Sequence, residues 1–172
     1  MNRTEFSSLI YQNLVENKEQ IHQQFISNKE QIGFFYLDDS KIVKLISEIC
    51  DLKSVYPDDS LYAGGLSLMK KDNFLNPHLD NSHDKDRNRW RVLNLLYYVT
   101  PDWKLENGGN LEVWPNGLKE PQITIESKFN RLVVMATHQK SWHSVSKVEI
   151  ENIRCCVSNY YFSDTPLLAS DS

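Results

Sequence analysis

The segment Asn76-Pro77-His78-Leu79-Asp80 places an imidazole and a carboxylate two residues apart. In an extended segment the side chains alternate, so His78 and Asp80 would point to the same side. Two such groups could supply two ligands of a metal ion, and a distant third residue would complete the site. The best candidate is His143, which follows the apolar segment 131–136 after a short loop. The remaining histidines lie in an expected surface helix, a charged loop and a turn: His22, His83 and His138.

Three protein ligands of these types would occupy one side of a metal ion and leave other positions open. Two histidines and one carboxylate are the ligand set expected of non-haem Fe(II) oxygenases. A closed set of four ligands would instead indicate structural zinc. A His-x-Asp segment alone is a weak signal, because it occurs by chance in many chains.

Arg154 strengthens the interpretation, because it lies 11 positions after His143 inside the apolar segment 153–162. A guanidinium held on a rigid strand can make two parallel hydrogen bonds to a carboxylate. A dicarboxylate cosubstrate could then chelate the metal at one end and meet Arg154 at the other. An ordinary strand-edge salt bridge is the alternative for an isolated arginine.

Two helices and a short strand are expected in the N-terminal third. Residues 4–29 carry apolar side chains near a 3.6-residue period, which predicts an amphipathic helix. Residues 32–37 suit a short strand. Asp38, Asp39 and Ser40 offer N-caps for a second helix, and its apolar face would consist of Ile42, Leu45, Ile46 and Ile49. Both helices are expected to cover a sheet without contributing to the chemistry.

The rest of the chain has β character. Segment 90–99 is the strongest expected strand, and its near-continuous apolar character predicts that both of its faces are covered. Polar residues 81–88 predict a surface loop beside the metal motif, and we hypothesise that this loop contacts the substrate as a lid. Short strands separated by turns favour a mainly β (α+β) fold, a sandwich or a barrel. The other expected strands are 61–69, 110–114, 123–125, 131–136, 144–148 and 153–162.

Four segments, in this order, resemble the 2-oxoglutarate and Fe(II)-dependent oxygenase superfamily, and within it the prolyl 4-hydroxylase-like branch. They are Pro77-His78-Leu79-Asp80; residues 91–99 followed by Trp103 and Gly108-Gly109-Asn110-Leu111; Trp142-His143-Ser144-Val145 with Val148; and Arg154 leading to Tyr160-Tyr161-Phe162. The resemblance covers roughly residues 60–162. It implies a double-stranded β-helix, a jelly-roll or cupin-like barrel with the metal at its mouth and N-terminal covering helices.

The resemblance also implies roles for single residues. His78, Asp80 and His143 would hold Fe(II) and be the catalytic residues, and Arg154 would bind the distal carboxylate of 2-oxoglutarate. Dioxygen would be the second cosubstrate, and ascorbate an accessory reductant. Three more residues lie on strands expected to face the barrel interior or its neighbours and could hydrogen-bond the cosubstrate, although a core role with a satisfied polar group is the alternative for each. They are Tyr62, Asn94 and Tyr97.

Two positions bear on the kind of reaction. Asp80 argues for hydroxylation, because related halogenases have a small residue there to make room for halide. Cys156 stands where the family often has serine, which puts a helping hydrogen bond to the cosubstrate in question. Three tryptophans could line the substrate mouth or cap the barrel: Trp103, Trp114 and Trp142.

The reaction implied is hydroxylation of an unactivated C–H bond, coupled to oxidative decarboxylation of 2-oxoglutarate to succinate and carbon dioxide. The substrate could be a prolyl residue in a peptide or a small amino-acid-like metabolite. Two alternatives stay open. One is a cupin-like metal- or ligand-binding jelly-roll protein without activity. The other is a zinc hydrolase with the same three ligands, which would need a general base that the neighbouring sequence does not offer.

Bulk properties set limits on partners and location. The 172 residues suit one domain, with helical support over 1–52, a jelly-roll core over 53–163 and a tail over 164–172. A net charge of −4 and the lack of a long basic run argue against nucleic acid. No apolar run reaches the roughly 18 residues of a membrane span. Three cysteines, two of them adjacent, and a polar N-terminus favour the cytoplasm. The oligomeric state, monomer or homodimer, stays undecided.

Overall fold

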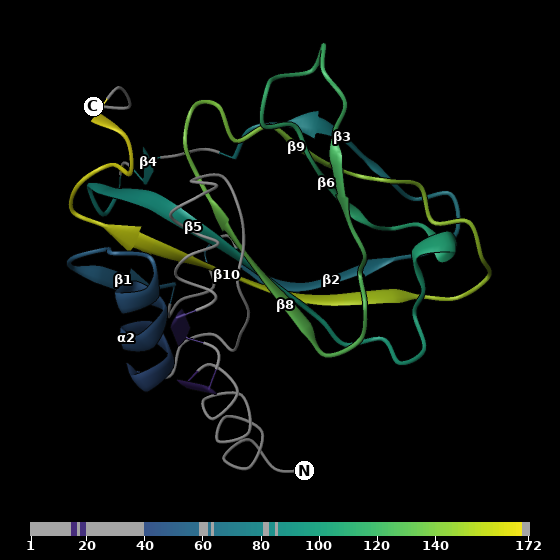
Figure 1. Ribbon diagram of the computed structural model, residues 1–172, viewed down its shortest axis with the longest axis horizontal. Helices are drawn as coiled ribbons and strands as arrows, with labels where there is room; N and C mark the ends of the chain where they lie inside the picture. Colours follow the sequence, from purple (N-terminus) through teal and green to yellow (C-terminus); the bar gives the residue numbers. More distant parts are fainter. Residues whose placement is uncertain are drawn as a thin grey trace.

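The computed structural model describes residues 15–16, 18–19, 40–58, 62, 64–80, 83–84 and 86–169. Within them the chain forms two antiparallel β-sheets and the helix α2 (Ser40–Ile49), as Figure 1 shows. Apart from helical residues 15–16 and 18–19, the helix expected over 4–29 lies outside the described residues. The strand expected over 32–37 also lies outside them. None of the helices in the described part is long and apolar enough to cross a membrane.

The larger sheet has six strands built around one long central pair. Strands β5 (Arg89–Tyr98) and β10 (Arg154–Ser163) pair along most of their length, as the apolar segments predict. The flanking strands are β1 (Val55–Pro57) and β2 (Gly65–Met69) on β10, and β4 (His83–Asp84) and β8 (Arg131–Ala136) on β5.

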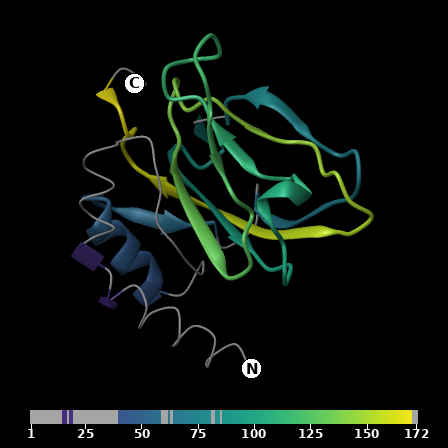
Figure 2. The same cartoon turned by 45° about the vertical axis from the view of Figure 1, so that its right-hand side comes forward.

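The smaller sheet has four strands in the order β3-β9-β6-β7. Their bounds are β3 Leu75–His78, β9 His143–Val145, β6 Leu111–Val113 and β7 Ile123–Ile125. The two sheets face each other, and α2 lies against the other side of the larger sheet (Figures 1 and 2). A short 3-10 helix, η1 (Leu105–Asn107), precedes β6.

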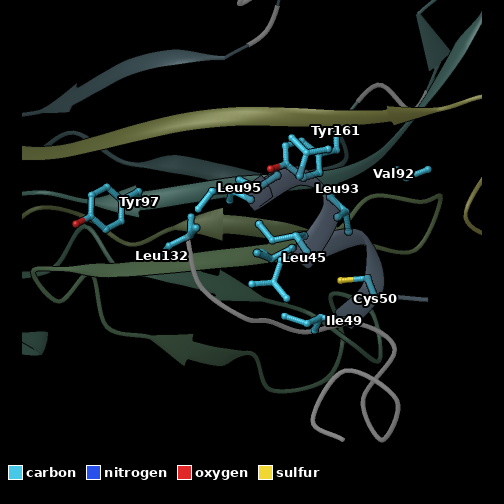
Figure 3. Close-up of a cluster of buried hydrophobic side chains, with 13 residues drawn as sticks. Leu45, Ile49, Cys50, Val92, Leu93, Leu95, Tyr97, Leu132 and Tyr161 are labelled. Atoms are coloured by element: carbon cyan, nitrogen blue, oxygen red, sulfur yellow. The ribbon is translucent and has the colours of Figure 1, made fainter. Parts of the chain in front are cut away.

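Helix α2 covers the outer face of the larger sheet, because its expected apolar face is buried there. Ile42, Leu45, Ile46 and Ile49 are all buried, with Val43 beside them. They pack against residues of β5, β8 and β10 in one cluster (Figure 3). The members from these strands are Val92, Leu93, Leu95, Tyr97, Leu132, Val134 and Tyr161.

The space between the two sheets holds a second apolar cluster. Leu111 and Val113 of the smaller sheet meet Val133 and Met135 of β8 there. Tyr98 and Cys156 of the central strands complete the cluster. The expectation that both faces of segment 90–99 are covered is therefore confirmed, since one face meets α2 and the other meets the smaller sheet.

The expectation of a surface loop over 81–88 is wrong for its middle part. His83 and Asp84 form β4 and pair with Trp90 and Arg89 of β5. Asp84 is buried, and its Oδ1 accepts hydrogen bonds from the backbone N–H groups of Asp86 and Arg87. A polar segment was read as exposed because its charges have no visible partner in the sequence, whereas here the carboxylate closes a local turn.

Candidate active site

The metal-binding groups come together at β3 and β9, the first two strands of the smaller sheet in the order β3-β9-β6-β7. Strands β3 and β9 are antiparallel, and their register places His78 opposite His143. The two imidazole rings lie 4.2 Å apart between centroids. Asp80 follows β3 by two residues, and one ligand atom from each of the three side chains lies within 4.8 Å of the others. The sequence prediction of a three-residue cluster is confirmed.

Local backbone contacts fix which ring nitrogen faces the cluster. His78 Nδ1 lies 2.8 Å from the carbonyl oxygen of Asn76, and His143 Nδ1 lies 3.0 Å from that of Ser141. A carbonyl oxygen only accepts, so Nδ1 of each ring is the protonated donor. In the neutral form of each ring, Nε2 is then the nitrogen without a proton and can bind a metal, which is the tautomer that ligating histidines need.

Burial also favours the ligand form of His143. Removal from solvent lowers the pKa of this imidazole, and the nearby charge of Asp80 opposes that shift only in part. Its Nε2 lies 3.8 Å from Asp80 Oδ2. The ring is therefore neutral at neutral pH and can offer its lone pair without first losing a proton.

Two side chains from the larger sheet support the Asp80 carboxylate. Asn94 Nδ2 donates to Asp80 Oδ2 at 2.9 Å and lies 3.3 Å from the Tyr160 hydroxyl. Burial, with the adjacent Asp80 carboxylate, raises the pKa of Tyr160, so its hydroxyl stays protonated. The contact of Asn94 with the cosubstrate stays a prediction, and the structure shows that its side-chain amide holds the metal ligand Asp80.

A second polar group lies deeper between the sheets. Arg154 is 3% exposed, its Nε donates to Ser127 Oγ at 3.4 Å, and its Nη1 has no hydrogen-bond partner. The guanidinium carbon lies 5.0 Å from the centroid of the Tyr98 ring. The Tyr98 hydroxyl is also buried without a hydrogen-bond partner, and burial raises its pKa to about 12. Two donors therefore lie buried together with unused hydrogen-bonding capacity.

The Gly-Gly turn makes room for this arginine. Gly109 has a φ of +64°, and a Cβ there would lie 2.7 Å from Arg154 Cδ and 3.0 Å from Val148 Cγ2. Gly108 has a φ of +71°, and a Cβ there would collide with the carbonyl of Lys147. Both positions therefore require glycine, for the left-handed backbone and for the close approach.

Two predicted site residues lie away from the cluster. Tyr97 belongs to the face of β5 that packs under α2, and its hydroxyl donates to Asn130 Oδ1 at 2.7 Å. Tyr97 therefore faces a neighbour of the barrel, the helix α2, whereas the adjacent Tyr98 faces the space between the sheets. Tyr62 is 58% exposed, with Arg87 stacked 5.8 Å from its ring centroid. Tyr98 was not predicted, because period two does not fix the phase of a strand that is apolar on both faces. Ser127 was not predicted because it lies between β7 and β8, where the sequence shows no period.

The tryptophans have separate roles. Trp103 is buried, and its Nε1 donates to the carbonyl of Gly108 at 2.9 Å, which supports the glycine turn. Trp114 and Trp142 line a small open cavity next to His143, together with Val113, Pro115, Met135, Lys140 and Ser141. Cys156 is fully buried on the inward face of β10, and burial raises the pKa of its thiol to about 12.

Fold and site together define a mononuclear metal site of the His-x-Asp…His type between two antiparallel sheets. The profile of the 2OG-Fe(II) oxygenase superfamily matches residues 64–162. The chain therefore belongs to this superfamily, and His78, Asp80 and His143 are its metal-binding triad. Family and triad together imply Fe(II) and 2-oxoglutarate as cofactor and cosubstrate. No curated protein sequence matches the chain.

Several solved structures are similar to this one. An oxidoreductase of the 2OG-Fe(II) oxygenase family from Burkholderia pseudomallei has a TM-score of 0.58 at 18% identity, over 74% of this chain and 54% of its own. A prolyl 4-hydroxylase from Phytophthora capsici has a TM-score of 0.55 at 18% identity, over 78% and 46%. A prolyl 4-hydroxylase from Pseudomonas putida has a TM-score of 0.51 at 14% identity, over 84% and 78%.

The chain spans about half the length of the first two of these proteins, 54% and 46%. At such identities the likeness concerns the fold. A mainly β chain with two antiparallel sheets matches the structures of 2-oxoglutarate oxygenases, which confirms the coarse fold prediction.

Proposed function

We propose that the chain is a hydroxylase with a double-stranded β-helix core and N-terminal covering helices. It would hydroxylate an unactivated C–H bond of a prolyl residue or of a small amino-acid-like molecule. The similarity to prolyl 4-hydroxylase structures supports the fold, and the residues of this chain support the chemistry.

One observation carries the proposal. The larger sheet has unused hydrogen-bond donors on the same face that contacts Asp80 of the triad. Arg154 Nη1 and the Tyr98 hydroxyl are buried without partners, and a buried donor left unsatisfied is costly. A carboxylate would satisfy both, and the charge-assisted hydrogen bonds to a guanidinium are among the strongest in proteins. The donor set therefore fits one end of a dicarboxylate such as 2-oxoglutarate, whose other end would reach the metal.

When bound, Fe(II) and 2-oxoglutarate supply the oxidation of a C–H bond by dioxygen, with release of succinate and carbon dioxide. The role of the protein's own residues is to hold the metal and to orient its ligands. His78, Asp80 and His143 would hold the metal through three ligand atoms, which would leave room for the cosubstrates. Asn94 holds the Asp80 carboxylate in one orientation, which is how outer contacts tune a metal site.

The apolar cluster between the sheets keeps water away from the deep end of the site. Leu111, Val133 and Cys156 are all at most 1% exposed. In such surroundings the guanidinium of Arg154 interacts with a carboxylate more strongly than it would in water. The presence of Asp80, where a small residue would admit halide, favours hydroxylation over halogenation.

The test is anaerobic reconstitution with Fe(II) and 2-oxoglutarate, followed by exposure to oxygen. We expect a weak visible absorption band from the metal with its cosubstrate, and then succinate, even without an added substrate. A zinc-loaded sample should show neither. Absence of both the band and the succinate in the iron sample would contradict the proposal and favour a binding protein or a hydrolase.

A further inference from the structure

Arg91 has an unusual position on β5. In a regular strand it would share a face with Leu93 and Leu95, and its charge would lie under α2. The pairing with β10 shifts at this point, because Tyr161 pairs with Leu93 whereas Phe162 pairs with Arg91. Val92 is thus an extra residue, a β-bulge, and it packs on the α2 side with Leu93. The bulge turns Arg91 to the inward face, and bulges beside functional sites often redirect a side chain in this way.

The guanidinium of Arg91 is buried and forms no ion pair with a described residue. The residue is 8% exposed, and its Nε has no hydrogen-bond partner. Its contacts are with aromatic rings, since Cζ lies 4.2 Å from the ring centroid of Tyr160 and 5.9 Å from that of Phe162. No ion pair or hydrogen bond joins this side chain to any residue in the described part of the chain.

Tyr160 connects Arg91 to the metal site. One face of its ring carries the guanidinium, while its hydroxyl meets Asn94, which in turn holds Asp80. Along the inward face of the β5–β10 pair, Tyr98 pairs with Cys156, then Asn94 with Tyr160, then Arg91 with Phe162. Arg154 lies at the Tyr98 end, with its Cζ 5.0 Å from the Tyr98 ring centroid. Two buried arginines therefore lie on opposite sides of the level at which Asp80 contacts the sheet.

A buried cation beside rings alone is energetically unfavourable, because the rings replace only part of its lost hydration. A peptide carbonyl would add hydrogen bonds but leave the charge uncompensated. A carboxylate would match the planar fork and neutralise the charge. In the proposed function, Arg154 binds the cosubstrate. Arg91 is therefore available to another anionic molecule that approaches the metal.

We propose that Arg91 binds the carboxylate of the primary substrate, which is then a free amino acid or a closely related small carboxylic acid. This inference rests on the proposed hydroxylase function and selects the small molecule over the peptide. Arg91 would be a specificity-determining residue, because it would hold the substrate by an end that an internal peptide residue does not have.

The experiment is calorimetric titration, without oxygen, of the full chain loaded with Fe(II) and 2-oxoglutarate. The probes are the twenty L-amino acids and their C-terminal amides. We expect at least one free acid to bind, and its amide to bind about tenfold or more weakly. Arg91→Gln should weaken binding of the acid by a similar factor and change binding of the amide little. Arg91→Lys, which keeps the charge, should retain part of the preference.

Arg89→Gln is the matched control. Arg89 lies two residues before Arg91 on the same strand, farther along it from Asn94 and Asp80, and its Cζ lies 4.0 Å from the ring centroid of Tyr56. This variant should keep the full preference for the acid. Arg91→Gln should also unfold at the same temperature as the wild type or higher, because it removes an uncompensated buried charge.

Three results would overturn the inference: no free acid binds, acid and amide bind equally, or Arg91→Gln keeps the preference of the wild type. Succinate release by the wild type in the same preparation separates the two proposals. If succinate forms but no preference for acids exists, only the role of Arg91 fails. If 2-oxoglutarate neither binds nor yields succinate, the proposed function fails, and this inference fails with it.

Discussion

The two faces of β5 alternate along the strand, and they differ in how their buried polar groups are hydrogen-bonded. Toward α2 the strand presents Leu93, Leu95 and Tyr97, and the Tyr97 hydroxyl is satisfied by Asn130. Toward the smaller sheet it presents Asn94, Leu96 and Tyr98. There the Oδ1 of Asn94 and the hydroxyl of Tyr98 are buried without partners. Adjacent tyrosines thus have nearly equal burial and opposite hydrogen-bonding states.

This difference teaches where the strand serves stability and where it serves chemistry. A protein interior normally satisfies its buried polar groups. Polar groups with unused hydrogen-bonding capacity that gather on one face, beside a metal triad and an arginine, mark the place that a ligand would complete. The opposite face supplies the rigid packing that holds those groups in position. Substitutions on the two faces should therefore be separable in their effects.

The largest effect is expected from the triad on the inward side. His143→Ala should lower succinate formation by about 100-fold or more, because two ligands do not hold the metal in the geometry that three provide. His83→Ala is the control, since that ring lies against Trp90, 4.7 Å between centroids, and contributes no ligand. Equal losses in the two variants would contradict the assignment of the triad.

A large effect on stability, and not on catalysis, is expected from the face of β5 that packs against α2. Leu95→Ala removes a fully buried side chain under α2 and should reduce the free energy of unfolding by about 2–5 kcal/mol. Denaturant titration measures this loss. Succinate formation per folded molecule should stay near the wild-type value at low temperature. A fall in that rate while the chain stays folded would show that the two faces are not separable.

Arg154→Ala should raise the 2-oxoglutarate concentration needed for half-maximal succinate formation by about 100-fold. Binding of Mn²⁺ to the triad, followed by paramagnetic resonance, should change little in this variant. Arg154→Lys keeps the charge but not the planar fork, and it should fall between the alanine variant and the wild type. An unchanged requirement in the alanine variant would remove Arg154 from the cosubstrate site.

Asn94→Ala should weaken metal binding by about 10- to 100-fold, the usual range for a group that orients a metal ligand. The reason is the 2.9 Å hydrogen bond from Nδ2 to Asp80 Oδ2. Titration with Mn²⁺ in the absence of 2-oxoglutarate isolates this effect from cosubstrate binding. If instead metal binding is retained and only the 2-oxoglutarate requirement rises, Asn94 acts on the cosubstrate, as the sequence alone suggested.

Much of this arrangement follows from the sequence. The spacing in His78-Leu79-Asp80 and the position of His143 predict the cluster, because β pairing of segments around these residues brings them together. The apolar segments predict β5, β8 and β10 with nearly correct ends. Residues with metal-binding side chains that lie next to a strongly apolar strand could therefore be predicted.

Other features depend on three-dimensional pairing that the sequence does not display. Which of Tyr97 and Tyr98 faces inward depends on the phase of β5, and both faces of that strand are apolar. The bulge at Val92 exists only in the register with β10. The contact between Asn94 and Asp80 was not predicted, because the two residues lie 14 positions apart in the chain. Short strands such as β1 and β4 carry too few residues to show a period.

The smallest expected effect is the most direct test of the account, because it compares the two adjacent tyrosines. The measurement is the dissociation constant of 2-oxoglutarate from the Fe(II)-loaded chain, titrated without oxygen. Tyr98→Phe should raise this constant by about fivefold, the worth of one hydrogen bond. Tyr97→Phe should leave it unchanged and reduce only the free energy of unfolding, by about 1 kcal/mol. Equal constants for the two variants, or a rise in Tyr97→Phe alone, would contradict the central claim that the inward face of β5 holds the cosubstrate.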